Sequence, residues 1–314
     1  MSSPLQLRDK YGPVFTVYFG SRPIVVLCGH DAVKEALIDK ADEFSGRKTN
    51  PTLERTFQGY GEAFSNGARW KQLRRFSLTV LRNFGMGKKS IEERIQEEAQ
   101  FLLEEFRKTK EKPFDPTYFF SRAVSNVICS IVFGDRFDYE DKEFQSLMEM
   151  MNNSFRKMSD TWAQLYDIYA NFLKYFPGPH TQVYDILEEM RLFIARRVKQ
   201  NQHTFDPNCP RDFIDCFLIQ MEKEKDNPAT EFNIKNLELT TLNLFFAGTE
   251  TVSSTLRYGF LLMMKYPKVQ GEVGEGIHTV LPPPRPAVSG FLGNPSLGWV
   301  AKPLPRFRCS SQQH

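Results

Sequence analysis

The feature that most constrains the fold is the segment from about Asn233 to about Lys265, which reads as one uninterrupted helix. At 1.5 Å per residue such a helix is on the order of 50 Å long, far above the mean length of helices in globular proteins. Apolar residues fall on most of its faces, which is typical of a helix that runs through the middle of a protein. The sequence therefore predicts a helical fold built around this segment.

A polar stretch, LNLFFAGTETVSS at residues 242–254, interrupts the apolar pattern of this helix. A glycine inside a helix costs about 1 kcal/mol relative to alanine, and serine and threonine hydroxyls can bond to carbonyls one turn earlier and bend the helix. Small Ala247 and Gly248 leave room for a ligand against the backbone, while Glu250 beside Thr251 supplies a proton source and a hydroxyl relay. The alternative is a kinked core helix in which the glycine serves helix packing and Glu250 pairs with an arginine. On the pattern alone, this alternative is favoured.

The rest of the chain predicts a mainly α fold with a small N-terminal β-hairpin. Two short strands, Val14–Phe19 and Ile24–Cys28, flank a Gly-Ser-Arg-Pro turn, and a loop is expected over roughly 41–66. Helical patterns then follow in series, separated by glycine and proline signals; they cover 67–81, 90–110, 116–133, 141–159, 181–202 and 210–225. From residue 271 the composition turns rich in proline and glycine without a sustained period, so we expect a domain over 1–270 and a disordered tail over 271–314.

Composition excludes several classes of function. The formal net charge of +3 gives no argument for nucleic-acid binding. The five cysteines form no CxxC and no ligand-like pairing with the five histidines, which favours reduced thiols and predicts no metal site built from these residues. No window offers eighteen uninterrupted apolar residues, so no transmembrane segment is expected.

The AGTET motif at Ala247 to Thr251 resembles the oxygen-binding helix of cytochrome P-450 monooxygenases, and of family 2 near its A and G subfamilies. Similar stretches occur in the same order from about Arg8 to Gln270. They read YGPVFTVYFGSRPIVVLCG, EFSGR, GYGEAFSNGARWKQLRRFSL, SIEERIQEEA, SNVICSIVFGDRFDY and PRDFIDCFL.

The resemblance implies the N-terminal part of the cytochrome P-450 fold, incomplete, with a haem cofactor. It implies insertion of one oxygen atom from O₂ into a small lipophilic substrate, as in xenobiotic metabolism, with electrons from NADPH through a cytochrome reductase. It also implies a location at the endoplasmic reticulum membrane. This chain shows no anchor, so a cytoplasmic or peripheral location stays open.

Residue roles follow from the same resemblance. Glu250 and Thr251 resemble the acid–alcohol pair that delivers protons to bound dioxygen, and Ala247 and Gly248 resemble the residues that make the gap for it. Asn243 and Phe246 resemble substrate-contacting positions. Other aromatics could line the pocket or belong to the core; they are Phe57, Phe64 and Phe155.

Trp70 and Arg74, in WKQLR, resemble the WxxxR whose arginine pairs with a haem propionate, and Arg47, in FSGR, resembles a second propionate partner. Guanidinium forks suit carboxylates, although a solvated helix face and loop is the alternative. Basic residues of the same region could face the reductase or only solvent; they are Lys71, Arg75, Lys88 and Lys89.

Two family signatures do not match. Cys309, in LPRFRCSS, lacks the family's phenylalanine, glycine and arginine at the expected spacings, and no other cysteine follows the long helix. The ExxR letters occur as Glu104-x-x-Arg107 and Glu188-x-x-Arg191, both before the oxygen helix, where surface pairs are expected. The alternative is therefore a catalytically inactive, truncated form without the haem-ligating cysteine and ExxR segments, and with an exposed apolar surface on the long helix.

Overall fold

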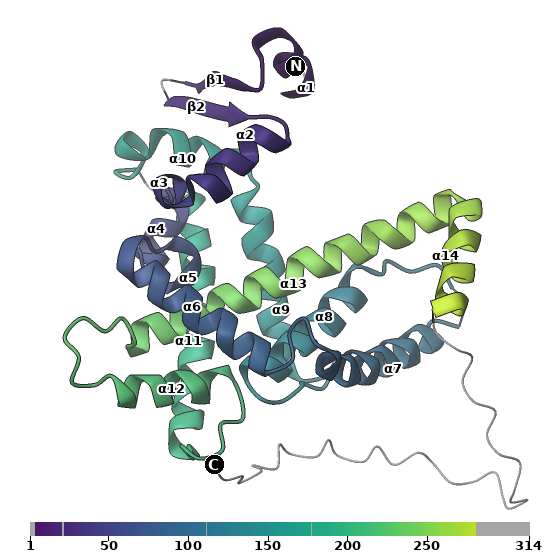
Figure 1. The fold of residues 1–314 in the computed structure, drawn as a ribbon. Coiled ribbons are helices and arrows are strands. Elements are labelled where there is room, and N and C mark those ends of the chain that lie inside the picture. Colours follow the sequence, from purple (N-terminus) through teal and green to yellow (C-terminus); the bar gives the residue numbers. More distant parts are fainter. Residues whose placement is uncertain (1–3, 21, 111, 177, 281–314) are drawn as a thin grey trace, which may run out of the picture.

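The computed structural model describes residues 4–280 apart from 21, 111 and 177. Its dominant element is helix α13 (Ile234–Lys265), which has 32 residues and crosses the molecule (Figure 1). The side chain of Asn233 caps its start by accepting a hydrogen bond from the backbone N–H of Asn236 at 3.0 Å. The helix ends at Tyr266, which has left the helical conformation and precedes Pro267. The long helix predicted from the sequence is confirmed.

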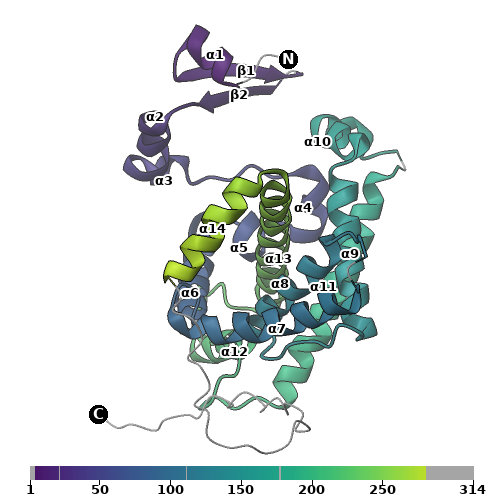
Figure 2. The same cartoon turned by 90° about the vertical axis from the view of Figure 1, so that its right-hand side faces the viewer.

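Two antiparallel strands form the only sheet in the described part of the chain. Strand β1 (Val14–Phe19) pairs with β2 (Arg22–Leu27), so that Val14 lies opposite Leu27. Helix α1 (Pro4–Tyr11) precedes the hairpin, and three short helical segments follow it: α2 (His30–Lys34), η1 (Glu35–Asp39) and α3 (Ala41–Phe44). Figures 1 and 2 place α1 and the hairpin at one end of the molecule, outside the helical body.

The helical body contains the remaining elements. They are α4 (Pro51–Phe57), α5 (Gly61–Phe64), α6 (Gly67–Asn83), η2 (Lys89–Ile91), α7 (Glu92–Lys108), α8 (Thr117–Val132), α9 (Lys142–Met158), α10 (Thr161–Leu173), α11 (His180–His203), α12 (Phe213–Lys223) and α14 (Pro267–Val280). The loop expected over 41–66 contains three short helices, because Asn50 caps α4 and Pro51 occupies its first turn, a start signal that the sequence interpretation passed over. Helix α10 was also not predicted.

The two halves of α13 have different surroundings. In the first half Leu237, Leu239, Leu242 and Phe245 are fully buried, and α13 packs most extensively against α8. Figure 2 looks nearly along α13 and shows α8, α9 and α11 gathered to one side of it. In the second half many apolar side chains are exposed, as the sequence predicted for a helix that lacks partners; they include Leu256, Tyr258, Leu261, Leu262 and Met264.

The predicted fold class, mainly α with an N-terminal hairpin, is confirmed. The predicted domain boundary after residue 270 falls inside α14, which continues to Val280. The rest of the expected tail, 281–314, lies outside the described residues, and the division into two parts stays a prediction. Among the described residues, no helix is long and apolar enough to cross a bilayer.

Candidate functional site

The polar stretch of α13 remains helical throughout. The hydroxyl of Thr251 donates to the carbonyl oxygen of Ala247 at 2.6 Å, and the hydroxyl of Thr255 donates to the carbonyl oxygen of Thr251 at 2.7 Å. Ala247, Thr251 and Thr255 are spaced by four residues, so they share one face of the helix, and all three are exposed. The helix therefore presents a small residue and two hydroxyls on one open face.

Glu250 lies beside this face and is half-buried. Its Oε1 accepts a hydrogen bond from the hydroxyl of Ser254 at 2.7 Å. Within the described residues Glu250 forms no ion pair, so the arginine partner of the alternative interpretation is not found. The carboxylate and its neighbouring hydroxyls thus form a small polar group that could hold a proton, the arrangement that general acid–base chemistry needs.

Gly248 faces the opposite way, toward α8. A Cβ atom at this position would lie 2.5 Å from Cδ1 of Ile128, so the missing side chain lets the two helices approach closely. Glycine here serves helix packing, as the alternative interpretation held, while Ala247 faces the open side. The predicted role of Ala247 and Gly248 beside a cofactor stays a prediction.

One predicted propionate partner, Arg74, pairs with a residue that the sequence interpretation missed, Glu62 of α5. Its Oε1 lies 3.1 Å from Nη1 of Arg74 on α6, and its side chain is 14% exposed. Burial raises the pKa of the Glu62 carboxyl above its ordinary value, and the positive charge of Arg74 opposes this shift. The short stretch GEAF carries no sequence pattern that marks Glu62 as functional.

Trp70 lies one turn before Arg74 on α6. The Arg74 guanidinium is 5.9 Å from the centre of the indole ring. The indole Nε1–H is buried and has no hydrogen-bond partner among the described residues. A buried donor without an acceptor is uncommon in native proteins, and an acceptor atom of a ligand would satisfy it. The chemistry of Trp70 and Arg74 fits a carboxylate, which accepts from both kinds of donor.

Arg47 is joined to the start of α6 through its backbone. Its N–H donates to Oδ1 of Asn66 at 2.6 Å, and Nδ2 of Asn66 donates to the Arg47 carbonyl oxygen at 2.9 Å. The exposed side chain lies near enough to Glu62 for its charge to lower the pKa of that carboxyl slightly. Both arginine charges therefore act on the Glu62 carboxyl, but only Arg74 forms an ion pair with it among the described residues.

Two asparagines of α13 hold α5 in place. Asn243 Oδ1 accepts from the backbone N–H of Ala63 at 3.0 Å, and Asn236 Oδ1 accepts from that of Gly61 at 3.0 Å. Asn243 is buried and lies one turn before Ala247. Its amide oxygen thus links the polar face of α13 to the helix that carries Glu62, whereas the sequence predicted only a substrate contact.

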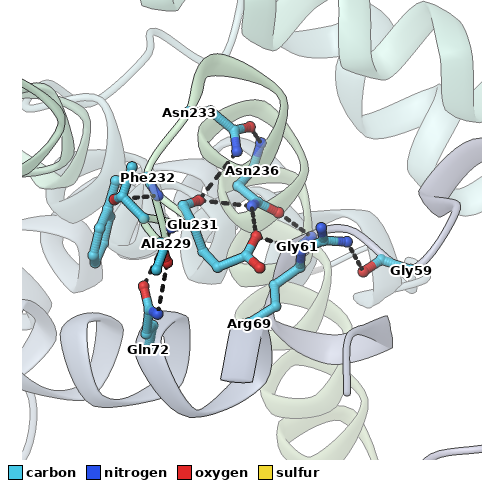
Figure 3. A network of polar contacts seen from close by, with 10 residues as sticks. Gly59, Gly61, Arg69, Gln72, Ala229, Glu231, Phe232, Asn233 and Asn236 are labelled. Carbon is cyan, nitrogen blue, oxygen red and sulfur yellow. Dashed lines mark hydrogen bonds and ion pairs between the residues drawn. The ribbon is translucent and has the colours of Figure 1, made fainter. Parts of the chain in front are cut away.

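Figure 3 shows the polar network that fixes the start of α13 against α6. Arg69 forms an ion pair with Glu231 at 2.7 Å and donates to the Gly59 carbonyl oxygen at 2.9 Å. Asn236 Nδ2 donates to the Glu231 carbonyl oxygen at 2.7 Å, and Gln72 exchanges two hydrogen bonds with the backbone of the 229–231 segment. The first turns of α6 and α13 are therefore held together by charge and by amide groups.

The candidate aromatic residues pack in pairs. The ring centroids of Phe57 and Phe64 are 4.3 Å apart, and those of Phe155 and Phe246 are 5.2 Å apart. Phe57 is buried in the core, and the other three are partly buried against it. The structure thus pairs Phe246, the predicted substrate contact, with Phe155.

The described cysteines offer no evident iron ligand. Burial raises the pKa of the Cys129 thiol far above its usual range and that of Cys216 to about 12, which keeps both protonated. Among the described residues no group of three or more histidine, cysteine or acidic side chains could hold a metal ion. Cys309 lies outside the described residues.

The two ExxR sequences that precede α13 differ in whether their glutamate and arginine form an ion pair. Glu188 and Arg191 form an ion pair at 2.5 Å, and Arg191 also pairs with Glu238, which ties α11 to α13. In the described part of the chain no ion pair joins Glu104 to Arg107. Among the candidate partner-surface residues, Lys71 pairs with Asp42 at 3.0 Å, while Arg75, Lys88 and Lys89 are exposed.

Comparison with known proteins gives a consistent result. The family model described as Cytochrome P450 matches residues 1–289. Cytochrome P450 2G1 of Rattus norvegicus is 68% identical over 277 residues, which cover 88% of this chain and 56% of that protein. Cytochrome P450 2A13 of Homo sapiens is 59% identical over 280 residues, which cover 89% of this chain and 57% of that protein. The chain thus spans little more than half the length of these relatives.

Proposed function

The chain belongs to the cytochrome P450 family, and on that premise we propose that its residues are those of a haem-dependent monooxygenase. The predicted resemblance to the A and G subfamilies of family 2 is confirmed by the relatives. The reaction that we propose is insertion of one oxygen atom from O₂ into a small lipophilic substrate, with electrons from NADPH through a reductase. Since the chain spans little more than half the length of its relatives, this activity is put forward as a proposal.

The observation that carries the proposal is that Arg74, beside Trp70 on α6, pairs with α5, and that α5 is hydrogen-bonded to α13. Asn243, one turn before Ala247, bonds to Ala63, and the neighbouring Glu62 pairs with Arg74. Arg74 is therefore linked, through α5, to the helix that carries the predicted proton-handling residues. No sequence spacing demands this arrangement, because α13 is far from α5 and α6 in the chain.

Haem, when bound, would supply the iron at which dioxygen is activated. Arg74 and Arg47 would hold its carboxylates, and Trp70 Nε1–H, which has no acceptor among the described residues, would donate to one of them. The hydroxyl of Thr251 donates to the Ala247 carbonyl oxygen at the exposed face. Glu250, which accepts a hydrogen bond from the Ser254 hydroxyl, would pass a proton from solvent to Thr251 when Thr251 gives one up.

The partner that we propose is an acidic surface of a reductase, which would meet the exposed Arg75, Lys88 and Lys89. Lys71 contributes less, because Asp42 already neutralises it. Family membership also supports a location at the endoplasmic reticulum membrane.

A second candidate is a catalytically inactive form that keeps the carboxylate-binding residues without the iron–thiolate bond. It is favoured by the state of the described cysteines, since Cys129 and Cys216 are held as neutral thiols. Such a chain would bind haem through Arg47, Trp70 and Arg74 but would not activate oxygen.

The test is the reduced carbon-monoxide difference spectrum of the chain after reconstitution with haem. A thiolate-type Soret band that disappears in Cys309→Ser supports the monooxygenase. A band of the non-thiolate type that weakens in the Trp70→Phe, Arg74→Gln double variant supports the inactive form. Absence of any haem band, or a band unaffected by these substitutions, contradicts the assignment of this cofactor site.

A further inference from the structure

A large cavity of 810 Å³ lies away from the candidate haem site, between α7, α8, α11 and the 204–212 segment that precedes α12. Its volume is in the range of small-molecule sites, about 300–1,000 Å³. None of the residues discussed above for haem, oxygen or substrate lines it. Its walls carry four arginines, and the state of each arginine decides what the cavity can bind.

Two of the four arginines are already neutralised by acids of the chain. Arg136 Nε lies 3.0 Å from a carboxylate oxygen of Glu98. Arg211 donates from Nε to Oδ2 of Asp215 at 2.7 Å and from Nη2 to Oδ1 at 3.0 Å. Guanidinium groups held in this way contribute to folding and have little capacity left for a ligand.

The other two, Arg94 and Arg197, form no ion pair with any described carboxylate. Arg94 Nη1 donates to the carbonyl oxygen of Ser130 and, at 3.0 Å, to its hydroxyl. Arg197 Nη1 donates to the side chain of Gln200 at 3.3 Å, and its Nε is buried without a hydrogen-bond partner. Both positive charges are therefore held by neutral groups only.

Both guanidinium groups are partly withdrawn from water. Burial lowers the pKa of Arg94 below its usual value, and the more distant charge of Glu97 opposes this shift. The Arg197 guanidinium lies 4.6 Å from the centre of the Phe137 ring. A guanidinium in such surroundings has lost part of its interaction with water. An anion that accepts its unpaired N–H would replace that interaction and stabilise the charge.

We propose that this cavity binds the oxyanion group of a small molecule, a phosphate or a carboxylate, between Arg94 and Arg197. Planar guanidinium forks match both groups in shape and charge. The hydroxyl of Ser130 on the same wall donates to the Val127 carbonyl oxygen at 2.8 Å and accepts from Arg94, so it holds the Arg94 guanidinium in place.

The acids of the cavity limit the charge of this ligand. Glu97, Asp135 and Asp206 line the cavity as well, and none of them forms an ion pair within the described residues. They would repel a ligand with several negative charges. The expected ligand therefore carries one anionic group on a neutral or cationic body.

The proposal is tested by calorimetric titration of the full chain with inorganic phosphate and, separately, with acetate. Sodium chloride at equal ionic strength is the control for general screening. We expect saturable binding of at least one of the two probes, and the tighter probe identifies the group. Arg94→Gln and Arg197→Gln should each weaken that binding about tenfold, the value of one charge-assisted hydrogen bond.

Arg196→Gln is the matched control, because Arg196 is the exposed neighbour of Arg197 on α11 and does not line the cavity. It should leave the binding unchanged. If Arg94→Gln fails to fold because Ser130 loses its partner, the binding measured for Arg197→Gln and Arg197→Lys tests the proposal in its place. No saturable binding of either probe, or equal loss in the Arg196 and Arg197 variants, overturns the proposal.

Discussion

The carboxylate of Glu62 lies 3.1 Å from the guanidinium of Arg74, the residue that family resemblance assigns to a haem propionate. The Glu62 carboxylate thus already pairs with the guanidinium group that a haem propionate would need. The two groups are equivalent in chemistry, so they compete for the same donors. Haem binding in this chain would require Glu62 to release Arg74 or to share it.

The first prediction is that Glu62→Gln strengthens haem binding. Glutamine fills nearly the same volume but carries no charge, so Arg74 becomes available to a propionate. We expect the dissociation constant for haem, measured from Soret absorbance, to fall by about tenfold. Glu43→Gln, at an exposed carboxylate of α3, is the control and should leave it unchanged. Weaker binding in Glu62→Gln would mean that Glu62 positions Arg74 for the cofactor instead of competing with it.

The second prediction concerns the unpaired indole N–H of Trp70. Trp70→Phe removes a buried donor that has no acceptor among the described residues, so the haem-free protein should lose little stability, or gain up to about 1 kcal/mol in urea unfolding. The same substitution should weaken haem binding, since the donor to the propionate is lost. Opposite signs of the two effects are the signature of a binding role. A large loss of stability without a change in haem affinity would assign Trp70 to packing alone.

The long helix, the hairpin and the series of helices could be predicted because each depends on local pattern and on punctuation by glycine and proline. The alternation of Val14–Phe19 and the apolar faces of Ile234–Lys265 are visible in the sequence. The short helices α4 and α5 were missed, because a helix of four to seven residues has too few turns to show a period.

The sequence could predict which residues belong to the candidate site but not the contacts between them. Resemblance picked out Arg47, Trp70 and Arg74, and their role at a cofactor stays a prediction; the structure places Trp70 beside Arg74. Glu62 was missed because its role arises from a contact between α5 and α6 that no local pattern encodes. Asn243 was expected at a substrate, yet its amide is used to hold the backbone of Ala63. Such tertiary hydrogen bonds become visible only when the helices are placed in space.

The third prediction is a loss of stability at neutral pH caused by Asp212, the N-cap of α12. Burial raises the pKa of its carboxyl from 3.8 to about 6, and Asp215, Asn201 and Arg211 also act on it. The folded pKa lies above the unfolded one. The stabilisation that the Asp212 carboxyl adds to the free energy of unfolding is therefore fully present below about pH 4 and is lost as the pH rises through 6. Between pH 5 and pH 7.5 the loss is about 1 kcal/mol in the free energy of unfolding.

Asp212→Asn should remove that part of the pH dependence, because an amide oxygen can still cap the helix and carries no charge. Urea unfolding of both proteins at pH 5 and pH 7.5 measures it, with Asp206→Asn as the exposed control. An unchanged pH dependence in Asp212→Asn would show that other groups are responsible.

The fourth prediction compares two glycines of α13. A Cβ at Gly248 would lie 2.5 Å from Cδ1 of Ile128, whereas a Cβ at Gly259 would meet nothing within 4 Å. Alanine gains about 1 kcal/mol of helix propensity at either position. At Gly248 the clash costs about 1–3 kcal/mol, so Gly248→Ala should be neutral or destabilising by up to about 2 kcal/mol, while Gly259→Ala should be stabilising.

The double variant Gly248→Ala, Ile128→Ala isolates the clash, because alanine lacks both Cδ1 and Cγ1, which would lie 2.5 and 2.8 Å from the new methyl group. Urea unfolding should show that the double variant is more stable than the sum of the two single changes predicts, by about 1 kcal/mol. Coupling of this sign would establish that Gly248 is required by the packing of α8 on α13. If Gly248→Ala instead raised stability as much as Gly259→Ala, the two helices would have room to separate, and the packing of α8 on α13 would not require the glycine.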